Sequence, residues 1–95
     1  MNFMFKEVIR SKIKQLTVFE LLEYASMYSI SLSHEQAHQI LVYLKDPHFD
    51  PFNLSDLQQL FEKIERLTSP QTTLKLQQIL REYIDLYQAE SWFKS

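Results

Sequence analysis

Two histidines and a glutamate stand at the spacing of a zinc-hydrolase motif in the string His34-Glu35-Gln36-Ala37-His38. In such enzymes the histidines share one helix face and bind the metal, while the glutamate activates the bound water. The extended motif needs glycine at position 41 and histidine at position 44, and this chain has leucine at both. The same string is typical of a helix start with two half-exposed histidines. We predict no metal and no cofactor, and keep His34 and His38 as candidate ligands of an alternative zinc-dependent hydrolase.

The rest of the chain offers little to catalysis. Its 95 residues include no glycine and no cysteine. The lack of glycine disfavours three motifs that need it: a phosphate-cradling loop, a dinucleotide-binding turn and the nucleophile elbow of a serine hydrolase. Without cysteine there is no disulfide, thiolate nucleophile or thiolate metal site. We therefore interpret the chain as a non-enzymatic protein of the cytoplasm, with no catalytic residues.

The absence of glycine also disfavours tight β-hairpins, whereas helices can begin on serine, threonine or asparagine. Capping boxes at residues 17–20 and 33–36 and the pair Ser69-Pro70 mark helix starts, and Asp46-Pro47 marks a stop. Five helices are predicted, at about residues 2–15, 17–28, 33–45, 53–67 and 70–89. We predict an all-α fold in which residues 1–95 form one compact single-domain bundle of about five short helices.

Each predicted helix carries apolar residues at helical spacing, and these stripes are the expected core. They are Phe5, Val8, Ile9, Ile13 and Leu16; Val18, Leu21, Leu22, Ala25 and Tyr28; Ala37, Ile40, Leu41 and Leu44; Leu57, Leu60, Phe61, Ile64 and Leu67; and Leu76, Ile79, Leu80, Tyr83, Leu86 and Tyr87. Phe49 and Phe52 are expected to hold the loop of residues 46–53 against this core.

The net charge of −2 is divided unevenly along the chain. Residues 1–16 hold four basic side chains and one acidic one, so that residues 17–95 are acidic. The basic first helix, which begins with aromatic residues, could lie on an anionic membrane. A core helix with a cationic outer face shows the same pattern. Because any surface helix is moderately amphipathic and the overall net charge is negative, we expect neither a membrane nor a nucleic acid as the partner.

Residues 17–45 resemble a helix-turn-helix unit, in which an alanine packs at the crossing and an isoleucine follows the turn. Ala25 and Ile30 stand at these places. The second helix of this unit has few of the lysines and arginines that contact phosphates. A helical corner with the same packing needs explains the pattern equally. A nucleic-acid-binding module at residues 17–45 is therefore kept as an alternative function.

An aromatic C-terminal face is the predicted interaction surface. It consists of Tyr83, Tyr87, Trp92 and Phe93. Tyrosine and tryptophan are enriched at the energetic centres of protein interfaces. The same side chains could instead close the core over the first helix. We predict an unknown protein partner or self-association through the fifth helix, since dimers are the commonest oligomers.

Three segments point to a family: residues 12–17 (Lys-Ile-Lys-Gln-Leu-Thr), 28–32 (Tyr-Ser-Ile-Ser-Leu) and 64–70 (Ile-Glu-Arg-Leu-Thr-Ser-Pro). With shorter matches at residues 20–22, 24–25, 35–37, 40 and 52–53, they resemble the YqfT family of small Bacillus-type proteins. The resemblance covers about residues 12–85 and leaves out the aromatic N-terminal segment and Trp92-Phe93. It implies a small cytoplasmic protein of unknown function, and it brings no catalytic residues. We predict a non-enzymatic protein–protein interaction module or regulator.

Overall fold

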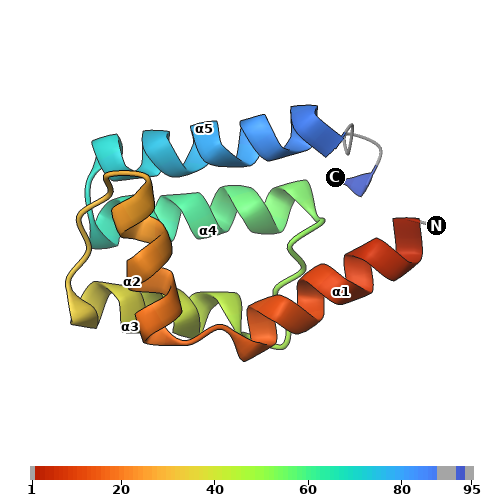
Figure 1. Ribbon diagram of the computed structural model, residues 1–95, viewed down its shortest axis with the longest axis horizontal. Coiled ribbons are helices and arrows are strands. Elements are labelled where there is room, and N and C mark those ends of the chain that lie inside the picture. The colour runs from red at the N-terminus through yellow and green to blue at the C-terminus, as the bar shows by residue number, and fades with distance from the viewer. Residues whose placement is uncertain (1, 88–91, 94–95) are drawn as a thin grey trace. The chain divides into compact units, whose positions relative to one another are not determined.

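The computed structural model describes residues 2–87 and 92–93 of the chain (Figure 1). These described residues form five α-helices: α1 (Asn2–Gln15), α2 (Val18–Met27), α3 (His34–Leu44), α4 (Leu54–Leu67) and α5 (Pro70–Tyr87). The prediction of an all-α fold with five short helices is confirmed, and each described boundary lies at or next to its predicted residue. The predicted end of the fifth helix, at residue 89, lies outside the described residues.

The chain divides into two compact units. Unit 1 is Met1–Phe49 and holds α1, α2 and α3, and unit 2 is Asp50–Ser95 and holds α4 and α5. The main helix packing is between α2 and α3 in unit 1 and between α4 and α5 in unit 2. A single domain over residues 1–95 stays a prediction.

In unit 1, side chains satisfy the first backbone groups of α2 and α3. The Thr17 hydroxyl accepts from the Glu20 N–H at 3.2 Å, and the Glu20 carboxylate accepts from the Thr17 N–H at 3.0 Å. Ser33 and Gln36 form the same reciprocal pair at the start of α3, with both distances 3.0 Å. Both predicted capping boxes are confirmed, so the starts of these helices follow from local sequence.

The turn after α2 ends the helix without glycine. Ser29 has φ of 58°, in the left-handed region that glycine usually occupies. The Ile30 N–H donates to the Ala25 carbonyl at 2.8 Å, and the Ser29 N–H donates to the Ser26 carbonyl at 3.1 Å. These two bonds make a Schellman motif, in which Ser29 takes the place of the usual glycine. The motif reverses the chain and brings the buried side chain of Ile30 under the end of α2.

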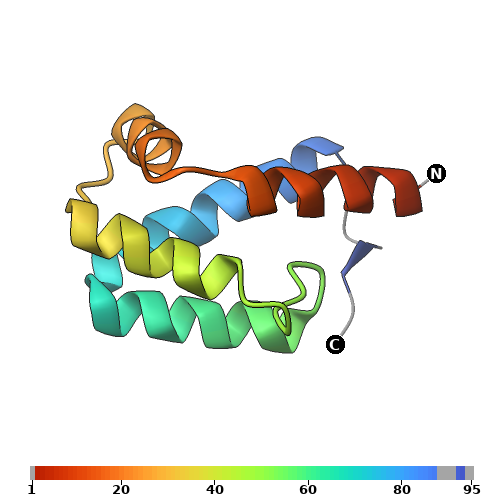
Figure 2. The ribbon, with the colours of Figure 1, turned by 90° about the horizontal axis from the view of Figure 1, so that it is seen from below.

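In unit 1, α2 packs against α3, and both helices contribute buried side chains. Figure 1 shows α2 running across the direction of α3, and Figure 2 shows α2 nearly end-on while α3 again lies lengthwise. Ala37 on α3 is 0% exposed, and Ala25 on α2 is also buried. Alanine at a crossing lets two helix backbones approach closely. Ala25 and Ile30 are both buried, in agreement with their predicted places in a helical corner.

Two expectations about the core were wrong. Tyr28, predicted to point inward, is 38% exposed, because it is the residue at which the α2 hydrogen-bond pattern ends and the turn begins. Phe5, Val8 and Ile9, predicted as the core stripe of the first helix, are exposed as well. Helical spacing shows that residues share a face, but it does not show whether another element covers that face.

Unit 2 is a helical hairpin with its own buried residues. Leu60 and Ile64 of α4 are buried, and so is Thr73 of α5, whose hydroxyl donates to the Ser69 carbonyl at 3.1 Å. The Ser69 hydroxyl accepts from the Thr72 N–H at 3.1 Å, which confirms the predicted cap before Pro70. On α5, Leu76, Ile79 and Leu80 are half-buried. The side chains of Tyr83, Leu86 and Tyr87 lie outside the described part of the structure.

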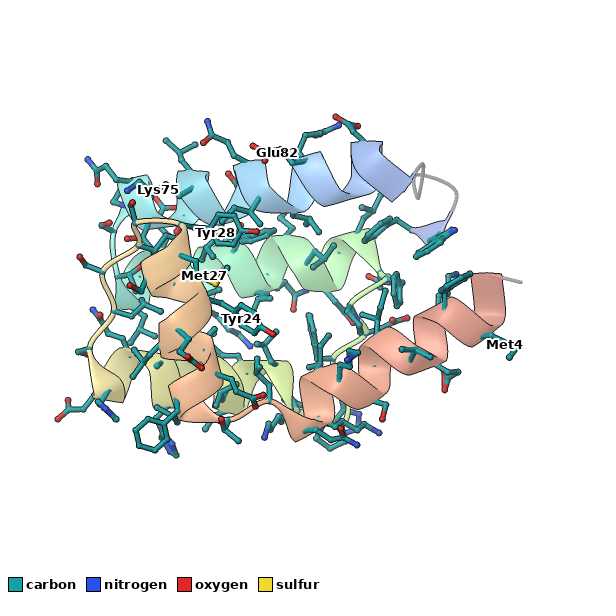
Figure 3. The ribbon with its side chains drawn as sticks, viewed as in Figure 1. Met4, Tyr24, Met27, Tyr28, Lys75 and Glu82 are labelled. Carbon is teal, nitrogen blue, oxygen red and sulfur yellow. The ribbon has the colours of Figure 1, made fainter. Side chains whose placement is uncertain are left out.

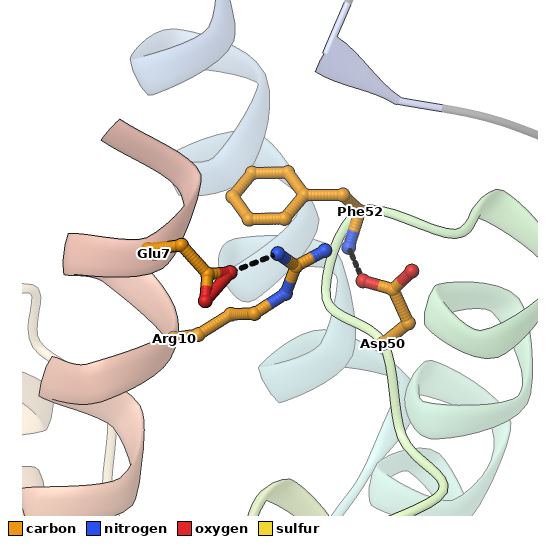
Figure 4. Close-up of polar contacts among 4 residues, drawn as sticks. All are labelled: Glu7, Arg10, Asp50 and Phe52. Atoms are coloured by element: carbon orange, nitrogen blue, oxygen red, sulfur yellow. Dashed lines mark hydrogen bonds and ion pairs between the residues drawn. The ribbon is translucent and has the colours of Figure 1, made fainter. Parts of the chain in front are cut away.

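The start of unit 2 is held by side-chain hydrogen bonds. The Asp50 carboxylate accepts from the Phe52 N–H at 2.9 Å (Figure 4), and the Asp56 carboxylate accepts from the Asp50 N–H at 2.9 Å. Asn53 caps α4 by accepting from the Asp56 N–H at 2.9 Å. Phe52 is only 5% exposed, as expected for a residue that anchors this loop. Phe49, the last residue of unit 1, is half-buried.

Candidate functional site

The two histidines of the zinc-like string lie on the first two turns of α3. His34 and His38 are both exposed, and the ring of His34 meets the edge of the Phe19 ring at a centroid distance of 5.8 Å. Within residues 2–87 and 92–93, no group of three His, Asp or Glu side chains is placed to hold a metal ion. The structure therefore gives His34 and His38 no third protein ligand in its described part.

A groove of about 680 Å³ opens beside the α2–α3 turn in unit 1. Its lining runs from Leu22 to Gln36 and includes four serines, at positions 26, 29, 31 and 33. The Ser33 hydroxyl caps α3 by accepting a hydrogen bond from the Gln36 N–H. No described residue of this lining is acidic, basic or a histidine, so none of these hydroxyls has a general base within the groove. The groove has the shape of a small site without the residues that nucleophilic catalysis needs.

The corner of α2 and α3 has the packing of a helix-turn-helix unit but not its charge. Residues 17–44 contain Glu20, Glu23 and Glu35 and no lysine or arginine. A helix that reads duplex DNA depends on cationic side chains against the phosphates. The net charge of this corner is therefore negative, like that of the phosphates of a nucleic acid, and the two would repel each other.

The most distinctive surface of unit 1 is apolar. Met27 is 74% exposed and Phe19 is 71% exposed, and Tyr24 and Tyr28 are exposed as well. We call Tyr24, Met27 and Tyr28 the α2 face, and Figure 3 labels all three along that helix, whereas Phe19 contacts His34 at the start of α3. Tyr24, Met27 and Tyr28 are three and four residues apart, so they share one side of α2.

A second apolar surface lies on α1. Met4 is 72% exposed, and Phe5, Val8 and Ile9 are also exposed. We call these four residues the α1 face. Their spacing of one, four and five residues places them together on one side of the helix.

Charged residues accompany both faces. On α1 the Arg10 guanidinium pairs with the Glu7 carboxylate at 2.6 Å (Figure 4), and Lys12 and Lys14 are exposed. On α2, Glu20 and Glu23 are exposed. Each face is therefore apolar with charges of one dominant sign.

The interaction surface predicted at the C-terminus is described only in part. Tyr83 and Tyr87 belong to α5, but their side chains lie outside the described residues. Trp92 and Phe93 are half-buried and contact the ring of Phe52, with centroid distances of 6.3 Å and 5.5 Å. Within unit 2 these two aromatic residues help to cover Phe52. Their role as an interaction surface stays a prediction.

The sequence pattern assigned Phe5, Val8 and Ile9 of the α1 face to the core and did not single out the α2 face, although a signal for the latter was present. Seven of the ten residues of α2 are apolar, in the sequence Val-Phe-Glu-Leu-Leu-Glu-Tyr-Ala-Ser-Met. A helix that is apolar nearly all round is normally covered on more than one side. In unit 1 the main packing partner of α2 is α3. The excess of apolar residues on α2 was therefore a sign of a second contact surface.

Comparison with known proteins places this chain among relatives of unknown role. A family model described as a protein of unknown function, DUF2624, matches residues 1–84. The "Uncharacterized protein YqfT" of Bacillus subtilis (strain 168) is 28% identical over 80 residues, which cover 84% of this chain and 95% of that protein. No solved structure matches the chain. Within the described residues, no helix is both long enough and apolar enough to cross a membrane.

The extent of the family match corrects one expectation. The resemblance seen in the sequence left out the aromatic N-terminal segment, but the family model begins at residue 1 and therefore includes all of α1. Both the α1 face and the α2 face fall inside the matched region. Trp92 and Phe93 fall outside it, as expected.

Proposed function

This chain belongs to the DUF2624 family of proteins of unknown function, and we propose that it acts as a non-enzymatic protein–protein interaction module. The observation that carries the proposal is the pair of exposed apolar faces on α1 and α2. Burying one large apolar side chain is worth about 1.5–3 kcal/mol. Several large apolar side chains are exposed to water on this surface, so their burial against a partner would be favourable.

The composition of the α2 face suits a protein partner. Tyrosine and methionine are enriched in the buried centres of protein interfaces. Methionine adapts its shape to an irregular partner surface, and tyrosine adds a hydroxyl that can form a hydrogen bond at the edge. Because the nearby groove lacks acidic, basic and histidine side chains, an interaction role accounts for this corner better than catalysis does. We propose a cytoplasmic location, in keeping with a chain that has no cysteine for disulfides.

A pull-down with matched variants tests this function. The tagged chain, its Met27→Glu variant and a Leu74→Glu control are incubated with native lysate of the source organism, with and without nuclease. Leu74 is an exposed apolar residue of α5 in unit 2, so the control adds the same charge outside the two faces. Circular dichroism confirms that both variants keep the helical content of the parent chain.

We expect a defined protein, a second copy of this chain included, to be captured in the presence of nuclease. Met27→Glu abolishes the capture and Leu74→Glu does not. Equal capture by all three chains would contradict a role for the α2 face. Capture that disappears with nuclease would favour the nucleic-acid-binding alternative at residues 17–45.

A further inference from the structure

Unit 1 separates its charges between two helical blocks. Residues 1–16 hold Lys6, Arg10, Lys12 and Lys14 against Glu7, a net charge of +3. Residues 17–44 hold three glutamates and no lysine or arginine, a net charge of −3. The α1 face lies on the basic block and the α2 face lies on the acidic block.

Each apolar face also has a charged residue on it or at its border. Lys12 follows Val8 by four residues, so it lies on the same side of α1. Glu23 lies four residues before Met27, so it lies beside Met27 at the border of the α2 face. An isolated charge within an apolar contact is costly, whereas an opposite charge on the partner offsets that cost. The two faces of this chain therefore complement each other.

The two faces do not meet within the structure of unit 1. Thr17, between α1 and α2, has an extended backbone with φ of −103° and ψ of 164°. Figure 1 and Figure 2 both show α1 leading away from α2 instead of lying alongside it. A helix of 14 residues is about 21 Å long, so α1 forms an arm that can reach another molecule.

We propose that α1 of one copy of this chain packs against α2 of a second copy, and the reverse, in a two-fold symmetric dimer. Such an arrangement uses the same complementary contact twice, as closed dimers do. It places the apolar side chains of each α1 face on an α2 face and sets Lys12 against the acidic block of the partner. The proposal rests on the interaction function above and names its partner.

An anionic membrane is the other occupant that the α1 face could have. The acidic α2 face has no role on an anionic membrane, where it would be repelled. A second copy of the chain uses both faces at once.

Single-cysteine variants test the contact directly, because the natural chain has no cysteine. Val8→Cys and Met27→Cys are prepared separately, mixed and exposed to mild oxidant. We expect disulfide-linked dimers in the mixture and few in either variant alone. A mixture of Val8→Cys with Glu82→Cys, which lies on α5, is the control and stays uncrosslinked.

Charge exchange gives a second, independent readout. Lys12→Glu and Glu23→Lys each weaken dimerisation about tenfold in analytical ultracentrifugation, because each puts like charges together at both contacts. Mixing the two variants restores a dimer of nearly wild-type affinity. In the mixed dimer, one contact keeps the natural pair Lys12 and Glu23. The other contact joins the two substituted side chains, whose charges are again opposite. Equal affinity of all chains, with no rescue in the mixture, would overturn the proposal.

Three other results would overturn the dimer while leaving the interaction function to its own test. The first is a wild-type chain that stays monomeric at every concentration and gives no crosslinks. The second is an intramolecular disulfide in the Val8→Cys, Met27→Cys double variant at high dilution, which would show that α1 folds back on its own α2. The third is a monomer that co-sediments with phosphatidylglycerol vesicles and loses that binding on Val8→Glu. In each case, capture that depends on Met27 still decides whether the chain is an interaction module.

Discussion

Ser29 holds a left-handed backbone conformation, with φ of 58°, where helices commonly end on glycine. A side chain in this region crowds the following carbonyl, and glycine avoids that cost. We predict that Ser29→Gly raises the free energy of unfolding by about 0.5–1 kcal/mol, after allowing for the greater freedom of glycine in the unfolded chain. Chemical denaturation monitored by circular dichroism measures the change.

Ser26→Gly is the matched control for this prediction. Ser26 lies inside α2, where glycine lowers stability by about 1 kcal/mol relative to a good helix former. Opposite signs for the two substitutions would identify the backbone conformation of Ser29 as the cause. A loss of stability in Ser29→Gly would instead show that the contacts of the serine side chain outweigh the backbone cost.

At the scale of elements, the packing of unit 1 depends on a small residue. Ala37 on α3 is fully buried, so a larger side chain must displace its neighbours or take a strained rotamer. We predict that Ala37→Leu lowers the free energy of unfolding by about 1–3 kcal/mol. His38→Leu, at the adjacent exposed position of α3, changes it by less than about 0.5 kcal/mol. Thermal unfolding of both variants compares them, and equal stabilities would contradict close packing at Ala37.

The ends of the helices could be predicted because their causes are local. Thr17 with Glu20, and Ser33 with Gln36, lie three residues apart, and the chain itself brings each pair together. The local sequence does not determine which side of a helix is buried, because this depends on elements far along the chain. The exposure of Phe5 and the contact between Phe52 and Phe93 could not be read from spacing alone.

In the candidate site, too, local features could be predicted and features that depend on distant residues could not. His34 and His38 stand at motif spacing, but a metal site needs a third group from elsewhere in the chain, and no local pattern supplies one. The aromatic residues near the C-terminus were visible in the sequence, yet the packing of Trp92 on Phe52 was not. The composition of α2 was the one local sign of an extra surface.

At the scale of the whole molecule, the small net charge of −2 conceals two opposed blocks in unit 1. If these blocks meet between copies, added salt must weaken the dimer by screening their attraction. Raising the salt concentration from about 0.05 M to about 0.5 M shortens the screening length severalfold. We predict a severalfold higher dissociation constant, with most of the change in the association rate. The buried apolar side chains keep the dimer from dissociating completely, because salt does not weaken apolar burial.

The salt dependence also separates the two contributions to the contact. Stopped-flow fluorescence with Ser95→Cys chains labelled at the introduced thiol measures association and dissociation at each salt concentration. In the mixture of Lys12→Glu and Glu23→Lys chains, one contact keeps its natural charges and the other is exchanged on both partners, so the salt dependence should match that of the wild type. In Val8→Ala the affinity should fall at every salt concentration by a similar factor, since less apolar surface is buried. A dimer that tightens as salt is added would show that apolar burial alone brings the copies together and that the charge blocks play no part in recognition.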